Sequence, residues 1–354
     1  MAVPAGAQQT FTGATDQNWD QATSNWNPGP TFTNNDDAIF DTVGGTVDIT
    51  EAGGITAGEI DINSGASGLI VTGNDLTINN NVTVTGAATT ADIQANITGN
   101  ATADGDGQLT LSGTVGGTVA NSGTGTTTVT NTVDAVNNTA GTTIVGSGGT
   151  VTNTTTVSAG TVEAQSGATM TGAVTASGTG TYTQSGGTST DLVNDGGTIN
   201  VDAGTATSLT NNATAGTSNV TDGQVTGTTT INGGAVVVDQ TTADAALELV
   251  GTTTLTDGTL TVTDGEVGTV VNQGTSGGAT EVTLTAGDIA ALTNTSGDAA
   301  LNGGTVTGAT TVAAGTVTNA GAAITTATTS GTGTYTQSGG TSTDLVNDGG
   351  TINV

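Results

Sequence analysis

Residues Thr253–Gly268 read TTLTDGTLTVTDGEVG, and this stretch contains the pattern that decides the fold. A short apolar and β-branched run ends at Asp-Gly. A second run alternates Thr with Leu or Val and ends at another Asp-Gly. Alternation with a period of two is typical of a strand with one buried face, and Asp-Gly is typical of a tight turn. The stretch therefore predicts two short strands separated by turns.

The same template recurs along the chain, as in SNVTDGQVTGTTTINGG (Ser218–Gly234) and AALNGGTVTGATTVAAG (Ala299–Gly315). Turn residues follow β-branched runs at intervals of about 15–20 residues, which fits one coil of a β-solenoid. These turn residues are Asp202, Asp222, Asp239, Asp257, Asn272, Gly287, Asn302, Asn319 and Ser338.

We therefore predict an all-β chain that forms a parallel β-helix, with each strand bonded to the equivalent strand one rung away. The general preference of parallel connections makes the expected coil right-handed. About 17 rungs fit from Thr46 onward, a length of roughly 80 Å at the strand spacing. A flat antiparallel meander is the competing interpretation, but ladders of identical residues need parallel stacking.

A long repeat overlies the short one. The segment SGTGTYTQSGGTSTDLVNDGGTINV occurs at Ser177–Val201 and again, without a change, at Ser330–Val354. A weaker match joins Thr155–Val162 to Thr310–Val317, so the duplicated regions are 155–201 and 310–354. We expect the chain to be a fragment of a longer array.

The composition excludes several classes of protein. The 354 residues include no Lys, Arg, His or Cys, and 30 acidic residues give a net charge of −30. Cationic and His-based catalytic groups are therefore missing, as are the usual zinc and haem ligands. Nucleic acid is not an expected partner, because binding it depends on Lys and Arg. Because these catalytic groups are missing, we predict that the chain is not an enzyme. No apolar run reaches the ~18 residues of a membrane helix, so we also predict that this segment does not insert into a membrane.

The first 45 residues differ from residues 46–354, which carry the repeats. Five of the seven aromatic residues lie in this first segment: Phe11, Trp19, Trp26, Phe32 and Phe40. An open solenoid end exposes strand edges and core, so we predict that the aromatics form a cap. A glycan-binding platform of Trp19 and Trp26 is the alternative. The first nine residues, MAVPAGAQQ, are similar to the end of a cleaved secretory signal, which predicts export, and an ordinary flexible terminus is the alternative.

The N-terminal region resembles a known family. Ala14–Thr50 contains paired Trp motifs, Asn-Asp-Asp-Ala-Ile-Phe and Gly-Gly-Thr-Val, and GLIVTGNDLTIN follows at Gly68–Asn79. This arrangement is similar to the start of autotransporter passenger domains, in the β-strand repeat regions of large exported proteins of Gram-negative bacteria. The resemblance implies a right-handed parallel β-helix, secretion to the cell surface and a frequent role in adhesion.

Carboxylates are the only acid–base groups available, and calcium is the cofactor that they would suit. Asp104 and Asp106 have the Asp-x-Asp spacing that opens an oxygen-ligand loop, although no EF-hand pattern follows. A second hypothesis is a column of carboxylates on successive rungs, formed by Asp202, Asp222, Asp239 and Asp257. The alternative for each residue is that Asp is present because it favours turns.

These features together predict a secreted or cell-surface structural β-solenoid that acts as an adhesin stalk, passenger segment or filament building block. Its expected partners are copies of itself, other surface proteins and glycans. The alternative is a module that binds calcium or glycans along its turns. Ice binding by Thr-rich faces is a weaker alternative, because the Thr runs have no fixed spacing.

Overall fold

The protein is all β, and its computed structural model describes residues 7–13, 16–28, 31–241, 247–274 and 280–354. Strands make up 61% of the chain, and the one helical element in these ranges is the 3-10 turn η1 (Ser64–Ala66). The strands coil into a parallel β-solenoid of about 17 turns, which confirms the predicted fold class. None of the described segments forms a helix long and apolar enough to cross a membrane.

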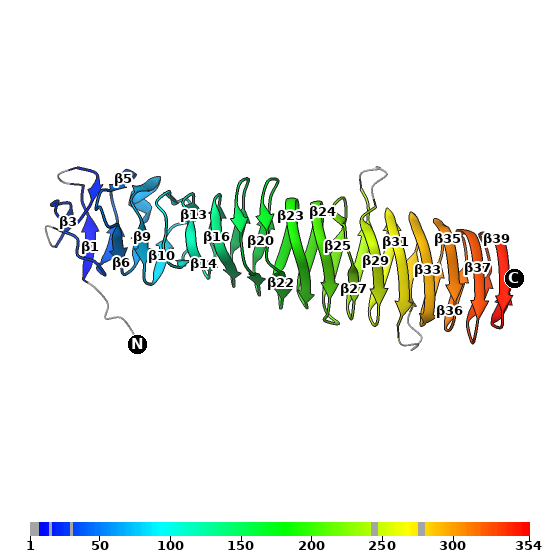
Figure 1. Ribbon diagram of the computed structural model, residues 1–354. Coiled ribbons are helices and arrows are strands. Elements are labelled where there is room, and N and C mark those ends of the chain that lie inside the picture. The colour runs from blue at the N-terminus through cyan, green and yellow to red at the C-terminus, as the bar shows by residue number, and fades with distance from the viewer. Residues whose placement is uncertain (1–6, 14–15, 29–30, 242–246, 275–279) are drawn as a thin grey trace. The chain divides into compact units, whose positions relative to one another are not determined.

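The chain divides into two compact units, Met1–Gly172 and Ala173–Val354, which are described separately. The boundary predicted between residues 45 and 46 falls inside the first unit. In each unit, strands of successive turns lie side by side (Figure 1). Turn length varies, since Thr126 pairs with Thr142 in a short turn and Val238 pairs with Val262 in a long one. The long turn exceeds the interval predicted from the sequence, which was therefore too narrow.

The described residues of the first unit form 21 strands. They are β1 (Gln8–Phe11), β2 (Asn18–Trp19), β3 (Trp26–Asn27), β4 (Asp37–Phe40), β5 (Gly45–Ile49), β6 (Ile55–Ala57), β7 (Ile60–Ile62), β8 (Leu69–Gly73), β9 (Leu76–Ile78), β10 (Asn81–Val84), β11 (Thr90–Ile93), β12 (Ala101–Ala103), β13 (Gln108–Leu111), β14 (Val115–Asn121), β15 (Thr126–Val129), β16 (Thr132–Asn138), β17 (Thr142–Val145), β18 (Thr150–Val151), β19 (Thr155–Val157), β20 (Thr161–Ala164) and β21 (Thr169–Met170).

The described residues of the second unit form the remaining 19 strands. They are β22 (Val174–Ser177), β23 (Thr181–Asp195), β24 (Thr198–Asn211), β25 (Thr217–Val220), β26 (Gln224–Val225), β27 (Thr229–Ile231), β28 (Ala235–Asp239), β29 (Leu249–Leu255), β30 (Thr259–Asp264), β31 (Glu266–Gln273), β32 (Thr280–Leu284), β33 (Asp288–Ser296), β34 (Asp298–Leu301), β35 (Thr305–Val312), β36 (Thr316–Asn319), β37 (Ala323–Ser330), β38 (Thr334–Gln337), β39 (Thr341–Asp348) and β40 (Thr351–Asn353).

Each full turn of the second unit has three faces. Face A is the stack of short strands that includes β28, β30, β32 and β34. The longer strands β29, β31, β33 and β35 form the other stack, which has a short face B and a face C. The pairings of β29 with β31 and of β33 with β35 shift register between these two faces, whereas β31 and β33 stay in register there and shift only after Asn272. One turn points five side chains inward, as Leu260 and Val262 on face A, Val267 on face B, and Val270 and Asn272 on face C do. These inward positions stack from turn to turn and form the core.

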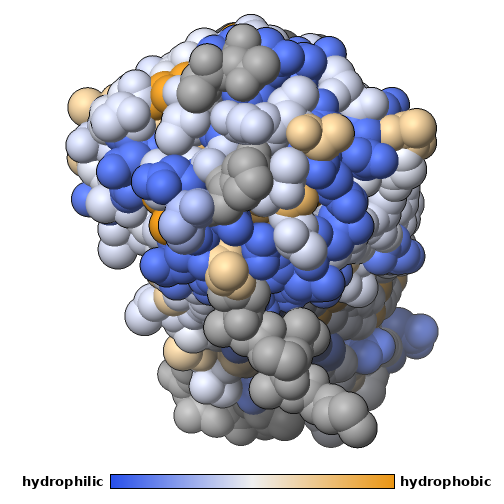
Figure 2. Space-filling view, turned by 90° about the vertical axis from the view of Figure 1, so that its left-hand side faces the viewer, coloured by the Kyte–Doolittle hydropathy of each residue, from blue (hydrophilic) through white to orange (hydrophobic). Residues whose placement is uncertain are grey.

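The first turns of the first unit are covered by the predicted aromatic cap. Phe11, Trp19, Phe32 and Phe40 are at most 1% exposed, and Trp26 is 4% exposed. The ring centroids of the contacting pairs lie 4.6–5.9 Å apart, mostly in edge-to-face or tilted geometry. Figure 2 looks onto this end and shows mainly hydrophilic and neutral described residues outside. The two Trp side chains are therefore interior, and they do not form the exposed glycan platform considered as an alternative.

Face C carries two inward positions per turn, and each turn usually fills one with an aliphatic and the other with a polar residue. Some turns have an aliphatic residue followed by a buried Asn: Leu192 and Asn194, Leu209 and Asn211, Val270 and Asn272, Leu292 and Asn294. Others have a buried Thr followed by an aliphatic residue: Thr229 and Ile231, Thr253 and Leu255, Thr310 and Val312. The first unit shows both types, with Val119 and Asn121 and with Thr155 and Val157.

The buried Asn side chains stabilise the corner that follows face C. Asn294 Nδ2 donates to the carbonyl oxygens of Gly297, at 3.1 Å, and Ala314, at 2.8 Å. Asn272 Nδ2 donates to Asn294 Oδ1 at 2.8 Å, which connects two neighbouring turns. The carbonyl oxygen of Gly297 also accepts a hydrogen bond from the backbone N–H of Thr316 at 3.0 Å. A buried carbonyl that is left unpaired costs about 1–3 kcal/mol, and the amides supply donors at these corners.

The buried Thr side chains do not have an equivalent role. Among the described residues, the hydroxyl groups of Thr229, Thr253 and Thr310 have no hydrogen-bond partner. Thr253 is 0% exposed and is paired in the ladder with Thr229 on one side and Val270 on the other. A Val side chain has nearly the same shape and no polar atom.

We expect Thr253→Val to raise the free energy of unfolding by about 1 kcal/mol, because it removes a buried hydroxyl without a partner. Urea unfolding followed by circular dichroism would measure the change. The matched control is Thr254→Val on the outer side of the same strand, where we expect a change of less than about 0.5 kcal/mol. A loss of stability in Thr253→Val would show that the hydroxyl is satisfied in solution.

Candidate functional site

Asp104 and Asp106 lie in the turn between β12 and β13, and both side chains are exposed. Asp106 Oδ1 accepts a hydrogen bond from the backbone N–H of Gly86 at 2.6 Å, so this carboxylate connects two stacked turns. The next turn packs directly on this one, since a Cβ on Gly123 would lie 2.2 Å from the backbone of Gly105. The two carboxylates therefore occupy the outside of a closely packed turn.

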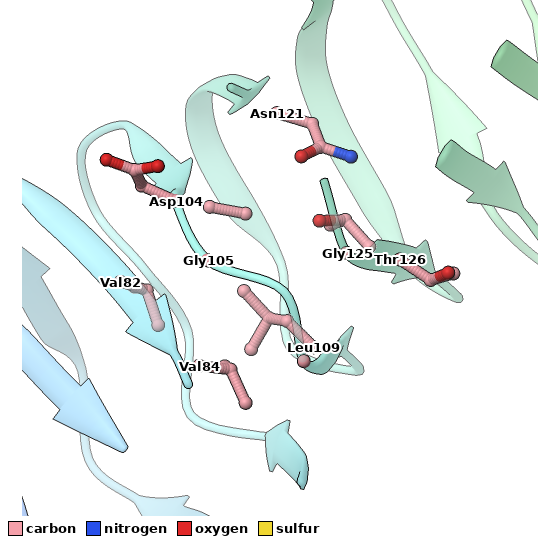
Figure 3. Close-up of a pocket in the computed structure, with 11 residues that line it drawn as sticks. Val82, Val84, Asp104, Gly105, Leu109, Asn121, Gly125 and Thr126 are labelled. Atoms are coloured by element: carbon pink, nitrogen blue, oxygen red, sulfur yellow. The ribbon is translucent and has the colours of Figure 1, made fainter. Parts of the chain in front are cut away.

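A small hollow of about 10 Å³ lies on the inner side of the same turn, with room for about one water molecule. Leu109, Asn121 and Thr126 are among the residues that line it. Figure 3 shows the carboxylate of Asp104 pointing away from the amide of Asn121. Asp104 is also among the residues that line this hollow, whereas Asp106 is not, so the two carboxylates do not meet in it.

The four remaining calcium candidates do not form the predicted column. Val201, Val220, Val238 and Val262 are aligned on face A, and Asp202 and Asp239 directly follow two of them. The equivalent residue in the turn between them is Thr221, because Asp222 lies one place further on.

Asp257 lies on a different corner of the solenoid. It follows Leu255, whose ladder partner is Ile231 on face C, and Asp239 is aligned with Asp264 instead. The prediction of one column failed because turns of different length place residues of similar spacing at different corners. Among the described residues, no group of three or more acidic side chains is arranged to hold a metal ion.

Hydrogen bonds from backbone N–H groups account for two of these side chains. Asp222 accepts hydrogen bonds from the backbone N–H of Thr241, at 2.9 Å, and from its hydroxyl, at 2.5 Å. Asp257 accepts one from the backbone N–H of Gly258 at 2.8 Å. The bond of Asp257 is the local turn role that the sequence left open as an alternative, whereas the bonds of Asp222 connect two successive turns of the solenoid.

Sequence reasoning missed a carboxylate group on the first turns of the first unit, formed by Asp37, Glu59 and Asp61 with Asp104 nearby. Ala38 is aligned with Ile60, so Asp37 and Glu59, which precede them, lie on neighbouring turns. Asp61 is aligned with Ile39 and with Thr83. Asp37 and Glu59 are separated by one full turn of the solenoid. Their proximity would have been predictable from the sequence if the pairing register of β4 and β7 had been known.

Burial and mutual repulsion perturb three of these carboxylates. Partial burial, and then the charge of Asp36, raises the pKa of Asp37. Partial burial raises the pKa of Glu59, and the charges of Asp61, Asp37 and Asp104 raise it further. The pKa of Asp61 is raised by burial and by Asp37. A hydrogen bond from Thr83 partly offsets the effect on Glu59 and on Asp61.

Two Glu side chains were also missed, and they are almost completely buried. Glu248 is 3% exposed and accepts a hydrogen bond from the backbone N–H of Glu266 at 2.6 Å. Glu281 is 6% exposed and accepts one from the backbone N–H of Asp298 at 2.5 Å. Glu266 and Asp298 are the first residues of β31 and β34. Each carboxylate therefore accepts the hydrogen bond of the first backbone N–H of a strand in the next turn, in the place of a strand carbonyl. The sequence contains no motif for this role.

Comparison of the chain with models of known protein families, with curated proteins and with solved structures finds no match.

The pH dependence of stability follows from the raised pKa values. A carboxyl group with a raised pKa binds its proton more tightly in the folded protein, so its stabilising contribution is complete below the unfolded pKa. That contribution is lost as the pH rises through the folded pKa. The reference values are 3.8 for Asp and 4.5 for Glu. Acidification from pH 7 to about 4 should therefore stabilise the first unit through these groups.

We expect Glu59→Gln to raise the stability of the first unit at pH 7 by about 0.5 kcal/mol, since it removes like-charge repulsion between neighbouring strands. The gain should disappear near pH 4, where the wild-type carboxyl is protonated. Thermal melts at both pH values would measure it. The control is Asp75→Asn at an exposed turn of the same unit. A gain of equal size at both pH values would contradict the electrostatic explanation.

Proposed function

We propose that this chain is a structural segment of an exported bacterial surface protein, in which the β-solenoid separates functional parts from the cell as a stalk or passenger segment. The resemblance of Ala14–Thr50 to autotransporter passenger domains supports this proposal, as does the absence of Lys, Arg, His and Cys from the chain. Trypsin-like proteases cut after Lys or Arg, so the solenoid offers them no site.

The observation that carries the proposal is that polar side chains are used to connect one turn to the next. On the outer surface of the second unit, Asn212 Nδ2 donates to Asp195 Oδ1 at 3.0 Å, and Asn232 Nδ2 donates to Asn212 Oδ1 at 3.1 Å. Thr256 Oγ1 then donates to Asn232 Oδ1 at 2.8 Å. One row of side chains therefore joins four consecutive turns.

The inside of the solenoid repeats this arrangement. The buried Asn side chains join corners of neighbouring turns, and the strand ladders join every face. The polar side chains of the outer row likewise donate and accept along the solenoid, from one turn to the next. Such a structure resists separation of its turns, because many hydrogen bonds have to break together. This property suits a spacer.

The location is tested with antibodies against the chain on intact cells that produce the natural protein. We expect labelling without permeabilisation, and its loss after treatment of intact cells with proteinase K but not with trypsin. An abundant cytoplasmic protein, labelled only after lysis, is the control. Labelling that requires lysis would contradict the surface location.

The calcium-binding alternative predicts a different thermal behaviour. For a structural solenoid, we expect 5 mM CaCl2 and 5 mM EDTA to give melting temperatures within about 2 °C of each other. A ligand raises the melting temperature only when it binds the folded state, and a solenoid without calcium sites has nothing to bind it. MgCl2 at the same concentration controls for screening of the net charge of −30. A calcium-specific rise of 5 °C or more would favour the binding module.

A further inference from the structure

The outer side of face C in the second unit carries an uninterrupted row of β-branched side chains. The row occupies the outward position between the two inward positions of each turn, through eight successive turns from Val193 to Thr328. Val occupies this position at Val193 and Val271. The other six turns have Thr there, namely Thr210, Thr230, Thr254, Thr293, Thr311 and Thr328. The row is therefore uncharged, although the chain has 30 acidic residues.

The uneven spacing of the Thr runs along the chain does not affect this row. The step from Val193 to Thr210 is short and the step from Thr230 to Thr254 is long, yet both pairs are aligned on neighbouring turns. The inward residues on either side of the row are aligned through the same turns, because the extra residues of a long turn lie at its corners. The irregular spacing that made ice binding a weaker alternative is thus absent from the folded face.

A second outer row lies two residues before the first on the same strands. In the six turns from Thr230 to Thr328 it contains only Thr and Ala, as Thr228, Thr252, Thr269, Ala291, Ala309 and Thr326. Neighbouring strands are about 4.8 Å apart, and alternate residues of one strand are about 6.6 Å apart. The two rows form a two-dimensional net of methyl and hydroxyl groups, with steps close to the repeats of the oxygen lattice of ice.

The hydroxyl groups of the first row are available to water. In the part of the chain that the structure describes, none of its six Thr hydroxyls has a hydrogen bond to another protein group. Other outer Thr residues bond within the protein, since Thr226 Oγ1 donates to the carbonyl oxygen of Ala206 at 3.2 Å and Thr295 Oγ1 to that of Asn272 at 3.0 Å. A free hydroxyl can donate one hydrogen bond and accept two, so the row offers water both kinds of group.

The net is ordered before anything binds to it. The χ1 angle of a β-branched side chain is restricted, and the strand ladders fix the backbone beneath it. Each contact with an ordered water molecule is weak, but equal spacing allows many turns to make the same contact at once, which multiplies their effect. A face of this kind favours a partner that is itself periodic in two dimensions.

Charge and side-chain chemistry distinguish between such partners. A second copy of the chain has the same net charge of −30, so two solenoids repel each other. A polysaccharide surface would find no aromatic ring or amide in the two rows. The surface of ice is uncharged, and its hydrogen-bonding groups complement free hydroxyls.

We propose that the outer side of face C in the second unit binds the surface of ice crystals. The methyl groups of the two rows fix the spacing of an ordered layer of water, and the free hydroxyls bond to that layer. The proposal concerns this face alone and does not rest on export of the chain, so the failure of either proposal leaves the other in place.

Partition into growing ice tests this binding. A dilute solution of the full chain and ovalbumin, an acidic control protein, is frozen slowly around a cold probe, and both proteins are measured in the ice and in the remaining liquid. We expect the chain to be enriched in the ice at least about fivefold over ovalbumin, because many simultaneous contacts hold it on the advancing crystal. A chain that stays in the liquid with ovalbumin would overturn the proposal.

The face is tested by a pair of substitutions with a matched control. Thr254→Tyr combined with Thr311→Tyr places rings that do not fit the net on the first row, so we expect the enrichment to fall to the level of ovalbumin. The control is Thr261→Tyr combined with Thr318→Tyr, on the outer side of face A, where both Thr residues are half-buried as in the first row. We expect this pair to partition as the wild type does. Equal enrichment of the two pairs, or equal loss, would overturn the assignment to face C.

A milder pair, Thr254→Ser combined with Thr311→Ser, keeps the hydroxyls and should keep the fold, which a thermal melt would verify. We expect at least about a twofold loss of enrichment, because each methyl group removed takes away an apolar contact. Unchanged enrichment would show that the methyl net is not used and would also overturn the proposal.

Other occupants of the face are identified with the same variants. Retention on microcrystalline cellulose, or a dimer in sedimentation experiments at high salt, is measured for the wild type and for the Tyr pair on face C. Either property, if it is lost in that pair while the wild type shows no enrichment in ice, would assign the face to a polysaccharide or to a second copy and overturn the proposal.

Discussion

The constraint on which the structure depends is that each turn must satisfy its backbone hydrogen bonds with the turns on either side. Parallel pairing keeps equivalent residues aligned, so a core residue in one turn lies on a core residue in the next. Turns as different in length as Thr126–Thr142 and Val238–Val262 are compatible, because only the aligned strands are fixed. Gly residues and local side-chain bonds absorb the variation at the corners.

The narrow core explains why polar residues are arranged so regularly inside it. Only five inward side chains per turn are available, and some corner carbonyl groups, such as that of Ala314, accept a hydrogen bond from a buried side chain. Asn294 and its equivalents satisfy those carbonyls, and the aliphatic residue two places earlier preserves the apolar core. Where Ile231 or Leu255 replaces the Asn, a Thr takes the earlier place. The polar residue of a turn therefore occupies either the first or the second inward position of face C.

The fold class, the aromatic cap and the repeat were predictable, because period-two alternation and Gly turns are local signals. Which carboxylates lie close together in space was not predictable. Asp257 was expected beside Asp239, but it lies at another corner, since the sequence does not show how many residues each corner contains. The proximity of Glu59 to Asp37 was missed for the same reason. Glu248 and Glu281 have no motif, and their burial follows only from the path of the chain.

The exact copy of Ser177–Val201 lies eight turns after the first, as the ladder from Leu192 to Leu345 shows. The two copies are therefore separated by a whole number of turns. Recombination between such copies would lengthen or shorten the protein by whole sets of eight turns, and the new junction would repeat an existing one. Variation in length would then require no new packing solution.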